Sequence, residues 1–317
     1  MSPIEIRELS RDFQTGIVNF WNRNLGKPYW VNEKTVSEKI FNDPDLAPEA
    51  SFLMTDGAKP AGFIVSKVNN SGLPECDNHA WISAFIIDKE YRNRGFGKTL
   101  YAKAEAKLRE SGVKKIILGG ERNNFFSGIP EPTPGSEEFF RKKGYVINND
   151  LHYDLMADLS KIDFKVLPVP LNHDAAYSTT EMVPADRPGL EAFFDQSFPG
   201  RWKYEILGYL DRGGDFKNVL LLRHQQTVAG FCKVFISEGP SDQDEFFGSF
   251  WGALGPVGIS AAIRGKGLGK RILHDSLCFL QGCGAHNVLI DWTVLKNFYG
   301  QFGFEPRRTY RGAYKCF

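Results

Sequence analysis

The sequence predicts a mixed α/β protein, of the α+β class, that is built from two similar domains. The chain has 317 residues, and a single hydrophobic core rarely grows beyond about 250–300 residues. The motif R-x-x-G-x-G-K occurs twice, at residues 92–98 and 264–270, with the two arginines 172 residues apart. Each copy lies between a strand-like run and an amphipathic, helix-like stretch. A repeat this long indicates a duplicated domain and not a short solenoid unit.

Two helices and then two strands are expected upstream of each motif copy. The helices are expected at residues 12–24, 33–42, 187–196 and 204–210, and the strands at 51–55, 61–68, 218–223 and 228–236. The strand-like run directly before each motif covers residues 81–87 or 246–259. In the second of these runs, glycines and Pro256 indicate a bulge or a splay.

After each motif, apolar residues recur at helical spacing and predict the buried face of a helix. These residues are Leu100, Ala104 and Leu108 in the first copy, and Ile272, Leu273, Leu277 and Leu280 in the second. Another strand follows at 115–118 and 287–292, and then a short helix at 139–145 and 298–304 that ends in glycine and an aromatic residue. We expect domains at 1–158 and 181–317, joined by a proline-containing linker at 159–180.

Composition limits the partners that the chain can bind. The 39 Lys and Arg residues balance 38 Asp and Glu residues to a net charge of +1, which argues against nucleic acid. An apolar share of 42% excludes a disordered protein. The five scattered cysteines and six histidines show no spacing that is typical of disulfide frames or metal sites. We find neither a secretory signal nor an apolar run of about 18 residues, and expect a cytoplasmic protein that does not bind membranes.

The glycine turns are typical of phosphate sites, because free backbone N–H groups and the positive end of a helix dipole meet there. Two known phosphate motifs do not fit. A P-loop needs G-x-x-x-x-G-K-[ST], but Arg92 stands where its first glycine would be, and Arg271 follows Lys270 in the second copy. A Rossmann fingerprint lacks its third glycine, since Leu100 stands there in the first copy and Lys270 in the second.

R-x-x-G-x-G after a strand and at the start of an amphipathic helix resembles the acyl-CoA pyrophosphate loop of the GNAT superfamily of N-acyltransferases. The resemblance covers both halves and implies a tandem GNAT protein. Each domain would then have a central mixed, mostly antiparallel sheet with a splayed strand pair and flanking helices. It also implies acetyl-CoA as co-substrate, without a metal. Carried over by position, the cofactor-binding residues are Ile87, Arg92, Arg94, Gly95, Phe96, Gly97 and Lys98 in the first copy, and Ile259, Arg264, Gly265, Lys266, Gly267, Leu268, Gly269 and Lys270 in the second.

The copies differ where the family often has a tyrosine that protonates the CoA thiolate. This position, four residues before the glycine that ends the short helix, is Tyr299 in the second copy and Phe140 in the first. A phenyl ring has no proton to donate, so the resemblance implies a catalytic C-terminal domain with Tyr299 as general acid and a degenerate N-terminal domain. A packing role for Tyr299 stays open. Both copies also lack the asparagine that is common seven residues earlier, where Thr133 and Trp292 stand.

Asp291 is the candidate general base. A carboxylate buried in the apolar run L-I-D-W would have a raised pKa, as a base near neutral pH requires. A solvated strand end and a structural ion pair with an arginine stay open. The acidic cluster Asp242, Asp244 and Glu245 would either attract a cationic amine or form a solvated turn.

Two further segments are candidates for acceptor binding. The loop at 119–135 is rich in glycine and proline, and its Phe125, Phe126 and Ile129 are expected to face a ligand or, preferably, the other domain. Arg201 and Trp202 lie where family members select the acceptor, although capping and packing would also explain them.

The sequence therefore predicts an acetyl-CoA-dependent N-acetyltransferase in which the amine of a small molecule or peptide attacks the thioester directly. Two alternatives are that both domains are active on different acceptors, or that the chain is a non-catalytic acyl-CoA sensor. We expect a monomer in which the two copies replace a dimer interface, and a homodimer stays open.

Overall fold

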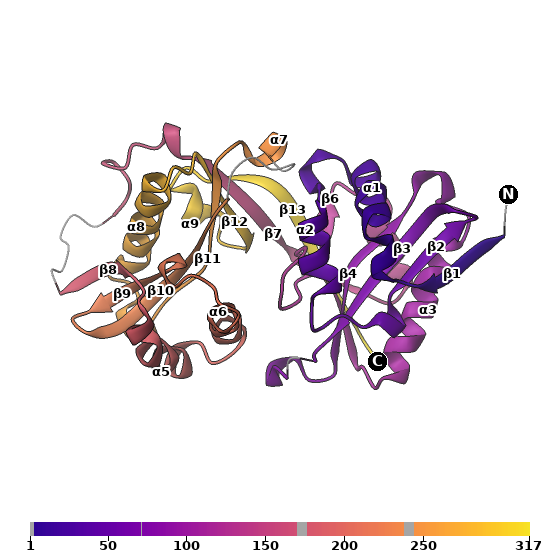
Figure 1. Ribbon diagram of the computed structural model, residues 1–317, viewed down its shortest axis with the longest axis horizontal. Helices are drawn as coiled ribbons and strands as arrows, with labels where there is room; N and C mark the ends of the chain where they lie inside the picture. The colour runs from indigo at the N-terminus through magenta and orange to yellow at the C-terminus, as the bar shows by residue number, and fades with distance from the viewer. Residues whose placement is uncertain (1–2, 71, 170–175, 238–243) are drawn as a thin grey trace. The chain divides into compact units, whose positions relative to one another are not determined.

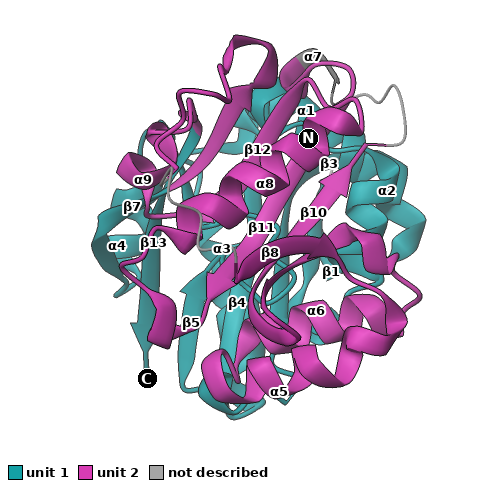
Figure 2. Cartoon of the chain, turned by 90° about the vertical axis from the view of Figure 1, so that its left-hand side faces the viewer, with its two compact units in different colours: residues 1–152, 308–317 teal, residues 153–307 magenta. Residues whose placement is uncertain are grey.

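The computed structural model describes residues 3–70, 72–169, 176–237 and 244–317, which form two compact units (Figure 1). Unit 1 contains residues 1–152 and 308–317, and unit 2 contains residues 153–307 (Figure 2). Each unit has a mixed, mostly antiparallel sheet with helices on both faces, which confirms the predicted fold class. Among the residues described, no helix combines the length and the apolar character that crossing a bilayer needs.

In unit 1 the strand order is β1-β2-β3-β4-β5-β13, and β6 also pairs with β13. Helix α3 packs on one face of this sheet, and α1 and α2 pack on the other. The strands are β1 (Ile4–Glu8), β2 (Phe52–Asp56), β3 (Lys59–Val68), β4 (His79–Ile87), β5 (Lys115–Leu118), β6 (Ile129–Glu131) and β13 (Glu305–Cys316). The helices are α1 (Gln14–Leu25), α2 (Glu33–Val36), α3 (Phe96–Glu110) and α4 (Ser136–Lys142).

In unit 2 the strand order is β8-β9-β10-β11-β12-β7. Helix α8 packs on one face of the sheet, and α5 and α6 pack on the other. The strands are β7 (Val146–Asp158), β8 (Tyr177–Glu181), β9 (Val219–His224), β10 (Thr227–Ile236), β11 (Trp251–Ile259) and β12 (Asn287–Thr293). The helices are α5 (Arg187–Ser197), α6 (Arg201–Asp211), α7 (Asp244–Phe247), α8 (Leu268–Gly282) and α9 (Lys296–Gly300).

Both units contain the splayed strand pair that the resemblance implied. The parallel strands β11 and β12 pair only from Trp251 to Ala253, and beyond that point β11 pairs with β10 alone in the described part of the chain. Strands β4 and β5 likewise pair only as far as Ile82. The register of β10 against β11 shifts where Gly255 and Pro256 lie, which confirms the bulge expected there.

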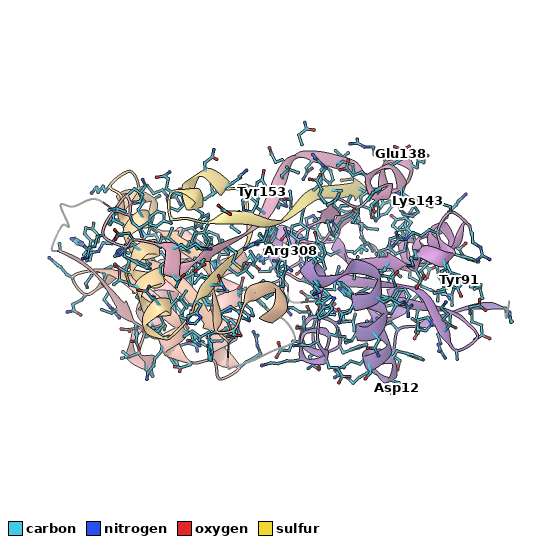
Figure 3. All side chains as sticks on the ribbon, turned by 90° about the horizontal axis from the view of Figure 1, so that it is seen from above. Asp12, Tyr91, Glu138, Lys143, Tyr153 and Arg308 are labelled. Carbon is cyan, nitrogen blue, oxygen red and sulfur yellow. The ribbon has the colours of Figure 1, made fainter. Side chains whose placement is uncertain are left out.

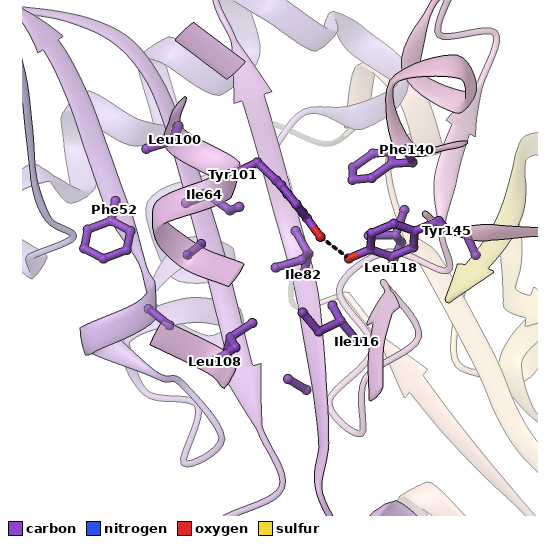
Figure 4. Packing of buried hydrophobic residues seen from close by; sticks show 14 of the residues in the cluster. Phe52, Ile64, Ile82, Leu100, Tyr101, Leu108, Ile116, Leu118, Phe140 and Tyr145 are labelled. Atoms are coloured by element: carbon purple, nitrogen blue, oxygen red, sulfur yellow. Dashed lines mark hydrogen bonds between the residues drawn. The ribbon is translucent and has the colours of Figure 1, made fainter. Parts of the chain in front are cut away.

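The predicted helix stripes form the cores of the two units. Leu100, Ala104 and Leu108 of α3 are buried, and Figure 4 shows two of them with Phe52 and Ile64 of the sheet. The four predicted residues of α8 are buried in the same way in unit 2. Each fully buried leucine or isoleucine contributes about 1.5–3 kcal/mol to stability, so these stripes fix both helices on their sheets.

The terminal strands of the two sequence halves are exchanged between the units. The last part of β13 pairs with β5 in unit 1, with Ala313 opposite Leu118 and Cys316 opposite Lys115. The last part of β7 pairs with β12 in unit 2. Tyr153 and Arg308, where the chain passes from one unit into the other, are labelled in Figure 3.

The compact units therefore differ from the division predicted from the sequence, because residues 308–317 lie in unit 1. A sheet edge accepts any strand whose backbone groups are in register, and the side-chain pattern does not specify which half supplies it. The strand predicted at 246–259 also begins later, at Trp251, since residues 244–247 form α7 and Phe247 stacks on Trp251 at 4.6 Å. Within the predicted linker, residues 170–175 lie outside the described residues.

Candidate functional site

The second motif copy forms a tight turn between β11 and α8. Strand β11 ends at Ile259, a short 3-10 turn follows, and α8 begins at Leu268. Gly265 and Gly267 both have φ of +77°, a left-handed conformation that glycine adopts without strain. Gly267 is the N-cap of α8, so the first N–H groups of the helix point out of the turn without carbonyl partners of the preceding turn.

A cavity of about 750 Å³ lies at this helix N-terminus. All eight residues predicted from the second copy line it, together with three apolar residues from other segments. Arg264, Lys266 and Lys270 supply three cations, and the Lys270 Nζ donates to Gln301 Oε1 at 2.7 Å. The lining residues are Pro168, Val169, Ile259, Arg264, Gly265, Lys266, Gly267, Leu268, Gly269, Lys270 and Phe298. Backbone N–H groups, cations and apolar walls at one place fit a nucleotide diphosphate with a flexible arm such as acetyl-CoA.

Tyr299 lies in α9, directly after the cavity residue Phe298. Its side chain is 5% exposed and packs at its ring edge against Phe298 and Phe304. Among the described residues, its hydroxyl has no hydrogen-bond partner. Burial raises the pKa of Tyr299, and Cys232 and Asp291 raise it further, so the hydroxyl carries its proton at neutral pH.

Cys232 of β10 is a buried neighbour of Tyr299. Burial raises the pKa of the Cys232 thiol to about 12, against a weaker effect of its hydrogen bonds to Ser276 and the Gly255 backbone. The thiol is therefore protonated at neutral pH and is a poor nucleophile.

Asp291 is exposed, and the burial that the apolar run suggested is wrong. Ile290 is in the core and Asp291, its neighbour in β12, points to the opposite face, just before the register of β12 against β7 shifts. Asp291 nevertheless acts electrostatically on Tyr299, so the two side chains belong to one region of unit 2. Asp242 of the alternative acidic cluster lies outside the described residues.

The same bulge holds Trp292 in a left-handed conformation with φ of +45°. The backbone N–H of Trp292 donates to the carboxylate of buried Asp154 at 3.0 Å. The Arg201 guanidinium lies 4.0 Å from the centre of the Trp292 ring. Glu205 is 3.9 Å from Arg201. A non-glycine residue in this conformation at the splayed strand is the kind of strain that functional sites store. Trp202, in contrast, packs against Phe198 in the core beneath α6.

Sequence reasoning missed Asp154, Pro168 and Val169. Asp154 comes from β7, which belongs by sequence to the first copy, so no local pattern connects it with Trp292. Pro168 and Val169 lie in the segment that the sequence predicts as a linker.

The first motif copy forms the same turn, but its side chains contact their own unit. Gly95 has φ of +86° and caps α3, like Gly267 in unit 2. The Arg92 Nε donates to the Ile87 carbonyl at 2.9 Å, and the Arg94 guanidinium lies over the rings of Tyr91 and Phe96. Arg92 and Arg94 are thus engaged within the turn, although both residues are exposed.

Aromatic side chains fill the region next to this turn. A Cβ on Gly97 would lie 3.6 Å from Phe85 and 3.8 Å from Phe139. Phe140, the counterpart of Tyr299, is buried against Tyr101 and Tyr145, whose hydroxyls are hydrogen-bonded at 3.1 Å (Figure 4). Burial raises the pKa of both tyrosines, so neither hydroxyl ionises near neutral pH.

The loop at 119–135 packs within unit 1, where its aromatic residues contact α1 and also Tyr310, a residue that the sequence assigned to the second domain. Phe125 and Phe126 stack on Trp21 of α1 at 5.1 and 5.3 Å. Ile129 belongs to the core beneath α3. Phe125 and Phe126 bury their rings within unit 1 because α1 and this part of the loop lie on the same face of the sheet.

The same loop contributes Glu121 to a buried cluster of charged side chains. Lys67 Nζ is 2.8 Å from both Asp43 Oδ2 and Glu121 Oε1, and the three side chains are fully buried. Burial opposes the charge of Lys67, but Glu121 and Asp43 outweigh it and hold the Lys67 pKa above its ordinary value. The face of unit 1 that α1 and α2 cover is therefore filled by charged and aromatic side chains of the unit itself. Across the described ranges, no group of three or more His, Cys, Asp or Glu residues is placed to hold a metal ion.

The regions that match known proteins correspond to the two copies of the repeat. The sequence profile of the Acetyltransferase (GNAT) family matches residues 17–127 and 187–304. An acetyltransferase from Sodalis glossinidius is 29% identical over 117 residues, which are 36% of this chain and 74% of that protein.

Two solved structures share the fold over 99% of this chain. The first is described as a GCN5-related glucosamine N-acetyltransferase region in a fungal multi-domain GH3 β-N-acetylglucosaminidase, with a TM-score of 0.85 and 21% identity. The chain spans 38% of that fungal protein. The second is a tandem GNAT protein from the clavulanic acid biosynthesis pathway, with a TM-score of 0.66, 14% identity and 98% of its length covered.

Proposed function

Because the chain belongs to the acetyltransferase (GNAT) family, we propose that it is an acetyl-CoA-dependent N-acetyltransferase whose active site is in unit 2. The observation that supports this proposal is the cavity at the N-terminus of α8, which is lined by all seven residues of the second motif copy and by Ile259 of the strand before it. The free N–H groups of α8 with Arg264, Lys266 and Lys270 would hold the diphosphate. The unpaired edge of β11 near Ile259 would hydrogen-bond the amides of the pantetheine arm.

Acetyl-CoA supplies an acetyl group that is activated as a thioester. The acceptor nitrogen attacks the thioester carbonyl carbon, a C–N bond forms and the C–S bond breaks. Tyr299 donates its proton to the sulfur that leaves, and Asp291, with its exposed carboxylate, takes the proton that the amine nitrogen loses. The thiol of Cys232 stays protonated and outside the reaction.

We propose one active site per chain. In unit 1 the arginines of the motif contact their own turn, Phe140 replaces the tyrosine, and the opposite face of the sheet contains the cluster of Lys67, Asp43 and Glu121. An acceptor on that face would have to displace the buried ion cluster, and a cofactor would have to release the exposed arginines from their contacts within the turn. The acceptor class is the amine of a small molecule or a peptide, and glucosamine belongs in any test because one structural relative is described as acting on it.

Release of the CoA thiol from acetyl-CoA, measured with a panel of amines, tests the proposal. Tyr299→Phe should lower kcat by about 10²-fold or more, the usual contribution of a general acid. Tyr145→Phe is the matched control, because it removes a buried tyrosine hydroxyl from unit 1 and should leave kcat unchanged. Unchanged kcat in Tyr299→Phe would contradict the acid assignment, and an equal loss in both variants would show a structural effect.

A further inference from the structure

The segment at residues 162–169 links the two sequence copies, yet it reaches the cofactor cavity. It follows the short 3-10 turn at Leu159–Lys161 and belongs to unit 2. Its last two residues, Pro168 and Val169, line the cavity beside the glycine turn and Phe298. Neither residue belongs to the motif or to the strands and helices of the repeated fold.

Packing fixes the course of this segment. Ile162 lies against Gly303, where an added Cβ would come within 3.3 Å of the Ile162 side chain. The Phe164 ring packs edge-on against His274 of α8 at 5.9 Å. Leu167 and Val169 pack against the core beneath α8, whereas Val166 is 75% exposed. The segment is therefore anchored from the end of α9 across α8 to the helix N-terminus.

Hydrogen bonds stabilise the same course. The backbone N–H of Lys165 donates to Asp163 Oδ1 at 3.0 Å, and the Val166 N–H donates to the Asp163 carbonyl at 3.1 Å. The Val169 N–H donates to the Leu167 carbonyl at 2.7 Å. These local bonds form two tight turns that bring Pro168 and Val169 to the cavity while Val166 stays in solvent.

We propose that this segment is a wall of the acyl-CoA site, in which Pro168 and Val169 contact the cofactor next to its diphosphate. The inference rests on the proposed function of the cavity. Arg264, Lys266 and Lys270 supply the charges, and Pro168 and Val169 add apolar surface to the same cavity, which lowers the local dielectric around a bound phosphate and strengthens its attraction to the cations. The chain that joins the two copies thus completes the cofactor site and sets affinity for acetyl-CoA.

Isothermal titration of the full chain with acetyl-CoA tests this inference. Pro168 is exposed, so Pro168→Asp should fold normally and place a carboxylate beside the diphosphate. We expect its Kd to rise about tenfold or more through like-charge repulsion. Val166→Asp adds the same charge to the same segment away from the cavity, and its Kd should stay within about twofold of the parent value. Steady-state kinetics of Pro168→Asp should show a raised KM for acetyl-CoA, while kcat and the KM of the acceptor stay unchanged.

Two more variants separate failure of this inference from failure of the proposed function. Lys266→Glu, in the glycine turn, should abolish acetyl-CoA binding. If it does while Pro168→Asp binds like Val166→Asp, the wall is refuted and the cofactor cavity stands. If Lys266→Glu binds normally, the proposed function itself fails. Val169→Ala should weaken binding several-fold through lost contact, and an unchanged Kd in that variant would also overturn the inference.

Discussion

At the scale of single residues, one hydroxyl distinguishes the chemistry of the two copies. Tyr299 and Phe140 occupy equivalent positions after equivalent turns, and both are buried. The Tyr299 hydroxyl has no partner among the described residues, whereas the tyrosine hydroxyls near Phe140 bond to each other. A buried phenol that is protonated and not already engaged suits proton donation, and paired phenols suit a stable core.

Lys67 provides the sharpest test of stability at this scale. Lys67→Met leaves the carboxylates of Asp43 and Glu121 buried without their cation, so unit 1 should lose about 3–5 kcal/mol of stability. Amide hydrogen exchange of β3 measures this loss locally, which matters because two units need not unfold together.

Lys59→Met is the matched control for Lys67→Met, because Lys59 sits on the same strand in an exposed pair with Glu90. It should leave the exchange of β3 unchanged. Equal protection in the two variants would show that the buried cluster does not stabilise unit 1.

At the scale of elements, the helices, turns and strands that occur in both copies of the repeat could be predicted from the sequence. The α3 and α8 stripes, the two glycine turns and the irregularity at Pro256 follow from the local sequence, whereas the splayed strand pairs follow from the family resemblance. Eight of the predicted site residues line one cavity because they are contiguous or flank one turn.

The elements that escaped prediction depend on distant partners. Strand β1 and the exchanged ends of β7 and β13 are defined by the edge that each one joins. The apolar run around Asp291 did not show which face of β12 this residue is on, and the bulge that follows it depends on Asp154 of the distant strand β7. Pro168 and Val169 had no repeat to mark them, since they lie between the copies.

The exchanged strand leads to a prediction about the C-terminus. Deletion of residues 313–317 removes the partner of β5, so the β5 amides that bond to β13 should lose protection from hydrogen exchange. Strand β12 is the internal control, because its outer partner is β7 and its protection should persist. Retained protection in β5, or equal loss in β12, would contradict the strand pairing described here.

At the scale of the whole molecule, the two units share one fold but differ in the side chains around their glycine turns. The net charge of +1 leaves no general attraction for a polyanion, so phosphate binding has to be local. Unit 2 has cations and apolar walls around a cavity at a helix N-terminus. In unit 1 the corresponding arginines and aromatic rings contact one another. We therefore propose that unit 2 binds the cofactor and that unit 1 has a structural role.

The most direct test of this asymmetry is the stoichiometry of acetyl-CoA binding, measured by titration calorimetry on the full chain and on two matched charge reversals. Lys266→Glu and Arg94→Glu change equivalent positions of the two glycine turns. We predict that one acetyl-CoA binds per chain, that binding is lost in Lys266→Glu, and that it is retained with the same Kd in Arg94→Glu. Two acetyl-CoA molecules per chain, or loss of binding in Arg94→Glu alone, would contradict this prediction.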